Sequence, residues 1–252
     1  MSIESDNQTL ASALLTAERV ARNVIPELAG RPLYIVEPAD GTMFTGAMLG
    51  WHGGLFYPGL DVALQPQLEA QGRWKGRGVC VVVNAFQCFV YATHDDDGQR
   101  AVIGVVLHEL AHAFDHCEKL DVPENQYDRF AAACELSAGT TAIMEPSPGN
   151  LFSPLLLGHG ESFIRLCAHL WYRSSHGGGF VLRPRHLAFG SDYTALPMLH
   201  TPQEYIEALW PELKKCQGLP LRALADIDPP PAFTELWNQV LVKFMSAAPD
   251  AA

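Results

Sequence analysis

The segment from Gln99 to Glu118 constrains the fold of this chain more than any other. Its first half is almost wholly apolar (AVIGVVL), and its second half carries three histidines, a glutamate and an aspartate (HELAHAFDH). The apolar residues predict a buried helix. A buried cluster of polar groups is costly unless something compensates it. A metal ion held by these side chains would supply that compensation.

The spacing of the polar residues favours zinc. Residues four apart share a face of an α-helix, so His108 and His112 can direct imidazole nitrogens at one ion. Glu109 lies too far round the helix to share those bond directions, but it can reach a water held by the metal. This is the logic of the HExxH pattern, in which the carboxylate takes a proton from that water. The alternative is a polar helix that matches the pattern by chance.

A catalytic zinc needs a third protein ligand, with water in the fourth position. His116 shares the face of His112, but one straight helix does not easily place three successive turns around a tetrahedral ion. We therefore expect His116 and Asp115 to support a ligand rather than to bind the metal. Two candidates remain: Glu135, on the next predicted helix, and His159, at the start of the helix after that.

At these residues the sequence resembles two families of zinc peptidases. HELAHAFDHC (His108 to Cys117), with ACE (Ala133 to Glu135) after it, resembles the mitochondrial inner-membrane peptidases that process an ATP synthase subunit. HELAHA followed by HGESF (His159 to Phe163) resembles the SprT-like metallopeptidases, in which the histidine of an HGxxF segment is the third zinc ligand. A glutamate on the helix after HExxH is the corresponding ligand in gluzincins.

The resemblance implies a zinc-dependent metallopeptidase with Zn²⁺ as its cofactor. It favours His159 as the third ligand and keeps Glu135 as the alternative, in which case His159 has another role. Glu109 would be the general base, and the substrate would be a protein or peptide. Four residues are candidates for the donor to the oxyanion: Arg165, His169, Tyr172 and Tyr193. The alternative function is a zinc-binding protein without peptidase activity, acting in binding or assembly.

The remaining pattern predicts an α+β fold: a zincin-like core, with a small mixed sheet packed on the HExxH helix and several further helices. The predicted strands are Pro32–Val36 and Gly78–Asn84, with Phe86–Tyr91 as an extension or a further strand. We expect the Gly78–Asn84 strand to bind an extended peptide along its edge. Further helices are predicted at Thr9–Leu28 (capped by Thr9), Tyr127–Met144, His159–Arg173, Thr201–Lys215 and Phe233–Met245. Gly41–Gly59 is predicted to be irregular.

We expect residues 1–252 to form a single domain, with 177–252 as a possible helical subdomain. The net charge of −11 disfavours a nucleic-acid partner. No apolar run reaches the roughly 18 residues that a membrane helix needs, and the first ten residues do not resemble a signal peptide. The six cysteines form no CxxC pair, which indicates free thiols in a reducing compartment. A cytoplasmic location is therefore expected.

Overall fold

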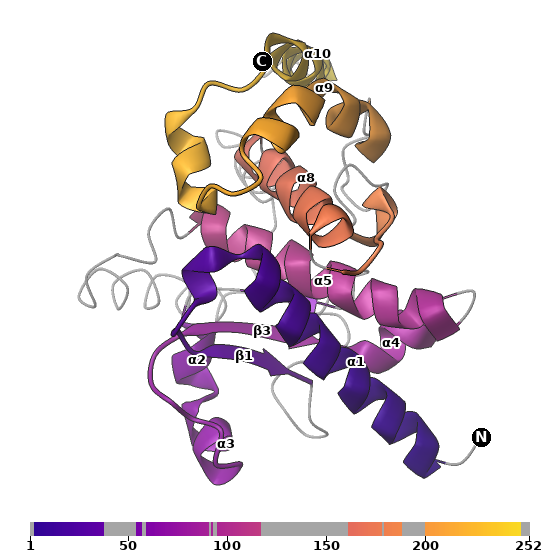
Figure 1. Cartoon of the computed structure of the whole chain (residues 1–252), viewed down its shortest axis with the longest axis vertical. Coiled ribbons are helices and arrows are strands. Elements are labelled where there is room, and N and C mark those ends of the chain that lie inside the picture. Colours follow the sequence, from indigo (N-terminus) through magenta and orange to yellow (C-terminus); the bar gives the residue numbers. More distant parts are fainter. Residues whose placement is uncertain are drawn as a thin grey trace.

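The computed structural model describes residues 3–37, 54–56, 59–90, 92, 95–116, 161–177, 179–187 and 200–247. These residues form a mostly helical structure with a small sheet, so the α+β class is confirmed. In Figure 1 the sheet lies below the long helix α5 (Asp95–His116), and further helices lie above it. The HExxH residues therefore belong to a helix between the sheet and the helical part of the structure.

The sheet has three strands in the order β1-β3-β2 and is mixed. β1 (Leu33–Val36) runs parallel to β3 (Val79–Val83), and β2 (Gly54–Leu55) runs antiparallel to it. The prediction of β1 and β3 was therefore confirmed. The expectation that a peptide pairs with the edge of β3 was wrong, because β3 is the central strand and β2 lies on its second side.

Strand β3 is buried on both faces, as its unbroken β-branched sequence predicts. Its odd-numbered valines face the main hydrophobic core, which also holds residues of α5 and α1 (Ile3–Val24). Cys80 and Val82 face a smaller cluster with residues of α2 (Leu60–Ala63) and α3 (Gln65–Ala70). The sheet is thus covered on both sides, and α5 packs on the larger core.

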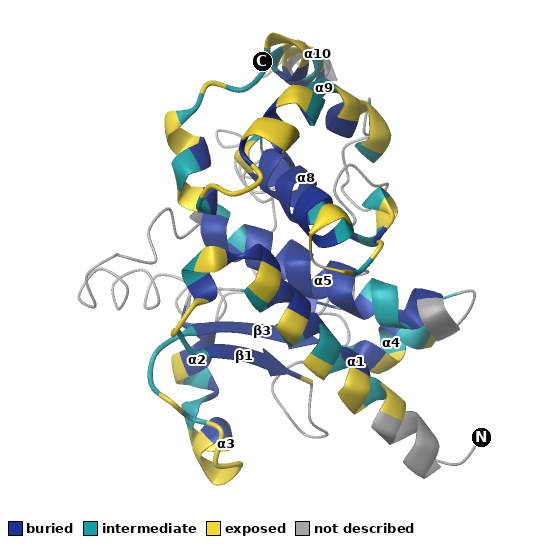
Figure 2. Ribbon diagram, in the orientation of Figure 1, coloured by how far each residue is buried: buried dark blue, intermediate teal, exposed yellow. Residues whose placement is uncertain are grey.

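Helix α5 is buried along its middle, where all residues from 102 to 111 have low solvent exposure. Among the elements that pack on it are α1, α8 (Glu161–His176) and the short turn η3 (Pro184–Leu187). Figure 2 shows the buried surfaces of α5 and α8 facing each other. The α4 helix (Ala85–Val90) contacts α5 near the N-terminus of α5, where Phe89 lies beside Gly98.

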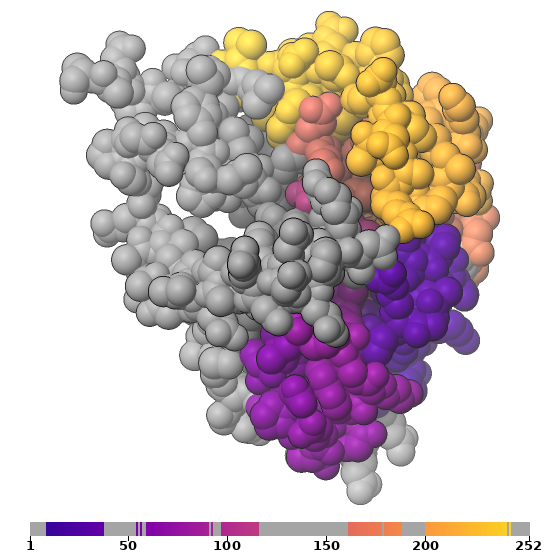
Figure 3. All heavy atoms as spheres, turned by 90° about the vertical axis from the view of Figure 1, so that its left-hand side faces the viewer, coloured from indigo at the N-terminus to yellow at the C-terminus, as the bar shows by residue number. Residues whose placement is uncertain are grey.

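The C-terminal part comprises α9 (Pro202–Lys215), η4 (Leu221–Asp226) and α10 (Pro231–Ala247). Helix α9 begins with the predicted capping box, in which Thr201 and Glu204 each accept from the other's backbone N–H. Figure 3 shows this part at one end of the molecule, the 60–90 segment at the other, and α1 between them.

Several predicted boundaries were wrong for local reasons. Helix α1 begins before Thr9, so this threonine does not cap it, and it ends at Val24 because Pro26 starts the 3-10 turn η1 (Pro26–Leu28). The run Phe86–Tyr91 is not a strand: residues 85–90 form α4, and the side chain of Asn84 accepts from the backbone N–H of Gln87. The irregular segment Gly41–Gly59 contains β2. The predicted helix Tyr127–Met144 lies outside the described residues.

Four of the cysteines lie in the described part, and all are buried free thiols: Cys80, Cys88, Cys167 and Cys216. Burial raises the pKa of Cys80 and of Cys88 to about 12, so both are poor nucleophiles. Among the described residues, no helix is long and apolar enough to cross a membrane.

Candidate metal centre

The two histidines of the HExxH pattern converge on one point. Their Nε2 atoms are 3.2 Å apart, and the two rings meet edge to face at 78°. His108 is 2% exposed and His112 is half-buried. The Nδ1 of His108 lies 2.6 Å from the carbonyl oxygen of Leu187. Because a carbonyl only accepts, Nδ1 carries the proton, and the Nε2 lone pair of His108 is directed toward His112.

This separation fits a tetrahedral metal. Two nitrogens bound at about 2.0–2.1 Å and a tetrahedral angle are roughly 3.3–3.4 Å apart. The observed 3.2 Å between the Nε2 atoms is close to that value without any rearrangement of α5. The two imidazoles therefore fit Zn²⁺ as two of its ligands.

Glu109 lies on the sheet side of the same helix, against β2. It is 5% exposed, and a Cβ placed on Gly54 would lie only 2.6 Å from its Oε1. Burial raises the pKa of Glu109 to about 8, and a hydrogen bond from the backbone N–H of Phe56 partly opposes that rise. In the metal-free chain, a carboxyl with this pKa takes up and releases a proton near neutral pH. Sequence reasoning missed the contact with β2, although the glycine pair at Gly53 and Gly54 was a signal of close backbone approach.

Phe163 packs against both histidines. Its ring stacks on His112 with centroids 4.2 Å apart, and it meets His108 edge to face at 4.9 Å. Phe163 is fully buried in α8. The aromatic of the HGESF segment therefore lies beside the HExxH residues.

The two candidates for a third ligand, His159 and Glu135, lie outside the described residues. Within the described part of the chain, no group of three or more His, Cys, Asp or Glu side chains is placed to hold a metal. Asp115 is half-buried and lines a cavity of about 690 Å³ between the end of α5, the start of α8 and η4. His116 is the last residue of α5, and its side chain is not described.

The proposed oxyanion donors have other partners. Arg165 donates to both carboxylate oxygens of Glu212, at 2.8 and 2.9 Å. His169 Nε2 lies 2.6 Å from Glu212 Oε1, and burial lowers the pKa of His169, so the neutral ring donates this bond. Tyr172 stacks on His176 with centroids 4.1 Å apart and meets Trp210 of α9 edge to face at 5.4 Å. These three residues connect α8 to α9, while Tyr193 lies outside the described residues.

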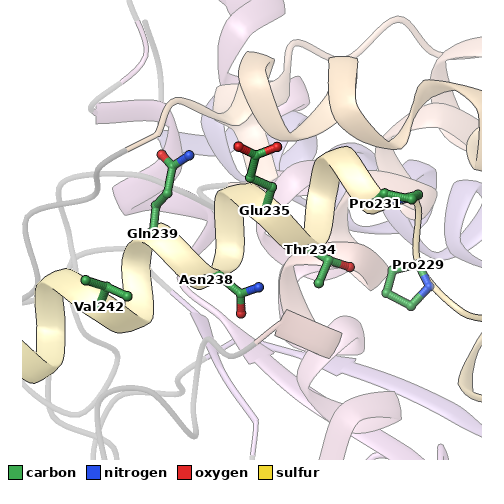
Figure 4. Close-up of a pocket in the computed structure, with 7 residues that line it drawn as sticks. All are labelled: Pro229, Pro231, Thr234, Glu235, Asn238, Gln239 and Val242. Carbon is green, nitrogen blue, oxygen red and sulfur yellow. The ribbon is translucent and has the colours of Figure 1, made fainter.

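Two other hollows do not resemble a catalytic site. One hollow, of about 720 Å³, is lined by α10 and the proline connector before it. Figure 4 shows its polar side chains, such as Glu235 and Asn238, along one helix. A second hollow, of about 540 Å³, lies between α1, β1 and the 72–75 turn. Its basic residues include Arg22 and Arg73, both of which donate to backbone carbonyls.

Comparison with known proteins leaves the family open. No protein-family model matches the chain, and no curated protein or solved structure is significantly similar to it. The likeness to zinc peptidases therefore rests on the HELAHA and HGESF residues and remains a prediction.

Proposed function

We propose that this protein is a zinc-dependent metallopeptidase, with His108 and His112 as zinc ligands and Glu109 as the general base. The observation that carries the proposal is the convergence of the two Nε2 atoms at 3.2 Å beside a buried carboxyl group. A chance match to HExxH on a surface helix would not require this burial. Two buried polar side chains, His108 and Glu109, beside the half-buried His112 on one apolar helix are better explained by a bound cation.

Different residues of the chain have different roles in the proposed hydrolysis. Zinc, when bound, supplies a Lewis acid that polarises a carbonyl and lowers the pKa of a water toward about 7. Glu109 accepts the proton of the attacking water and returns it to the leaving amine. The backbone N–H of Phe56 holds the carboxyl of Glu109 in place during both transfers. Phe163 and the surrounding core exclude bulk water from the imidazoles.

The third ligand is proposed to be His159, with Glu135 as the alternative. Phe163 contacts both histidines of the HExxH pattern, and it belongs to the same HGESF segment as His159. The connection from His159 to the first residue of α8 is two residues long and spans at most about 7 Å. A ligand from this segment is therefore compatible with the position of α8.

The first experiment is the zinc content per chain of the wild type, His159→Ala and Glu135→Ala, measured by elemental mass spectrometry. We expect one zinc in the wild type and a loss only in His159→Ala. A loss only in Glu135→Ala would transfer the ligand role to Glu135. A freshly purified wild type that contains no zinc and takes none up would refute the proposal.

The second experiment separates a peptidase from a zinc-binding protein without activity. Glu109→Gln is expected to retain zinc and to lose cleavage of unfolded protein substrates, because the amide cannot accept the proton. Glu207→Gln, on the exposed surface of α9, is the matched control and should keep wild-type activity. Zinc binding without cleavage of any substrate, including an extract of the cell's own proteins, would favour a role in binding or assembly.

A further inference from the structure

The segment Val181–Leu187, here named the strap, lies across α5 and is tied to two helices. On the α8 side, the indole N–H of Trp171 donates to the carbonyl of Leu182 at 2.8 Å. On the α5 side, a guanidinium nitrogen of Arg185 lies 3.7 Å from a carboxylate oxygen of Asp97. The carbonyl oxygen of Leu187 accepts a hydrogen bond from Nδ1 of His108. The strap thus bridges α8 and α5, and its last residue supplies the acceptor for an imidazole of the candidate site.

The strap approaches α5 closely at Gly104. A Cβ placed on this glycine would overlap the carbonyl oxygen of His186 and lie 2.8 Å from its Cβ. The nearest clashing atoms belong to the backbone of His186. A side chain at position 104 therefore cannot be accommodated by a rotamer change alone. Gly104 lies one helical turn before His108, on the same face of α5. A glycine inside an otherwise apolar helix is unfavourable relative to alanine, which agrees with a packing requirement here.

We propose that Gly104 and the strap position His108 for metal binding: Gly104 lets the strap reach α5, and the Leu187 carbonyl then fixes the ring orientation and tautomer of His108. This inference rests on the proposed zinc site. Gly104 is a positioning residue, since it contacts neither the metal nor a substrate. Backbone carbonyls that accept from a ligand histidine fix which ring nitrogen is available to the ion.

The matched variants are Gly104→Ala and Gly98→Ala. Both replace a glycine of α5 by alanine, so the change in helix propensity is shared. At Gly98 the new Cβ would meet the ring of Phe89, which is a side chain remote from the histidines. A difference in His108 tautomer or Zn²⁺ affinity between the two variants is therefore due to the displaced strap and not to the change in helix propensity.

The first readout needs no metal. Long-range ¹H–¹⁵N spectra of the chelator-treated protein report which nitrogen of His108 carries the proton. We expect the Nδ1–H tautomer in the wild type and in Gly98→Ala, and a loss of that single tautomer in Gly104→Ala. An unchanged Nδ1–H signal in folded Gly104→Ala would overturn the inference whether or not the protein is a peptidase.

The second readout is Zn²⁺ affinity, measured by competition with a chromophoric chelator. We expect Gly104→Ala to bind Zn²⁺ about 10–100-fold more weakly than Gly98→Ala, the usual effect of losing such a partner. Equal affinities in the two variants would overturn the inference while leaving the proposed zinc site intact. Absence of Zn²⁺ binding in the wild type would refute the zinc site, and with it the role of the strap in metal binding.

A second perturbation keeps the test valid if Gly104→Ala does not fold. Ser175 Oγ on α8 also hydrogen-bonds the carbonyl and the N–H of Leu182. The triple variant Trp171→Phe/Ser175→Ala/Arg185→Ala therefore removes these side-chain anchors and leaves α5 and Leu187 unaltered. We expect it to weaken Zn²⁺ binding by up to about tenfold, the equivalent of one lost hydrogen bond. Wild-type affinity together with a wild-type His108 tautomer would overturn the inference.

Discussion

Burial of Glu109 makes the stability of the metal-free protein depend on pH in a specific direction. The folded-state pKa is about 8 against an ordinary value of 4.5, mainly because of burial. Between these pH values the folded chain keeps a proton that the unfolded chain has released. The stabilisation is therefore fully present below about pH 4.5 and is lost as the pH rises through about 8.

The magnitude follows from the two pKa values. At 1.36 kcal/mol per pKa unit, the contribution of Glu109 to the free energy of unfolding falls by about 3–4 kcal/mol between pH 5 and pH 8. Glu109→Gln removes the titration and keeps an oxygen that can accept from the N–H of Phe56. We therefore expect the variant to be more stable than the wild type by several kcal/mol at pH 8, and by much less at pH 5.

The assay is urea unfolding of chelator-treated protein at pH 5, 6, 7 and 8. The quantity of interest is the difference between Glu109→Gln and wild type, because titration of other groups largely cancels in it. Glu207→Gln should run parallel to the wild type, since its side chain is exposed in both states. A constant difference between Glu109→Gln and wild type over this range would refute the assignment of Glu109 as a buried, titrating carboxyl.

Three further predictions address the surroundings of the site. Under the proposed function, Gly54→Ala should lower peptidase activity more than zinc content, because its Cβ would collide with Glu109 and not with either histidine. Equal losses in activity assays and elemental analysis would contradict this. Phe163→Ala should cost about 3–5 kcal/mol in urea unfolding and weaken zinc binding, because it leaves a cavity beside both imidazoles; unchanged zinc affinity would show that the stacking is not needed. Arg165→Met should cost about 3–5 kcal/mol by leaving Glu212 without its main cationic partner, and Arg165→Met/Glu212→Leu should recover part of that loss; an equally unstable double variant would argue against the ion pair as the cause.

The sequence predicted correctly those helices and strands whose start or type is set by neighbouring residues. The capping box at Thr201 and Glu204 placed the start of α9, and the β-branched run placed β3. The run after Asn84 was ambiguous, because a short apolar stretch fits a strand or a buried helix equally well. The side chain of Asn84 at the helix start was the signal that would have decided it.

The HExxH spacing predicted the shared face of His108 and His112, and the structure brings their Nε2 atoms together. The groups that support these residues were not predictable in the same way. The N–H of Phe56 and the carbonyl of Leu187 are backbone groups. Every residue carries the carbonyl in the same form, and every residue except proline carries the N–H. In the sequence, these backbone contacts are indicated only by Gly54 and Gly104, the glycines that allow the segments to approach α5 closely.

The hydrogen bond from His108 to Leu187 also has a consequence for the order in which the site is made. Its two residues are 79 positions apart, so a ribosome that has released the HELAHA segment still has to synthesise the acceptor. Until then the emerging chain carries both imidazoles without the carbonyl that orients the first one. Long-range contacts form late because their loops must close first. Under the proposed function, the site matures only after translation has passed residue 187, and a partly made chain is not yet a competent protease.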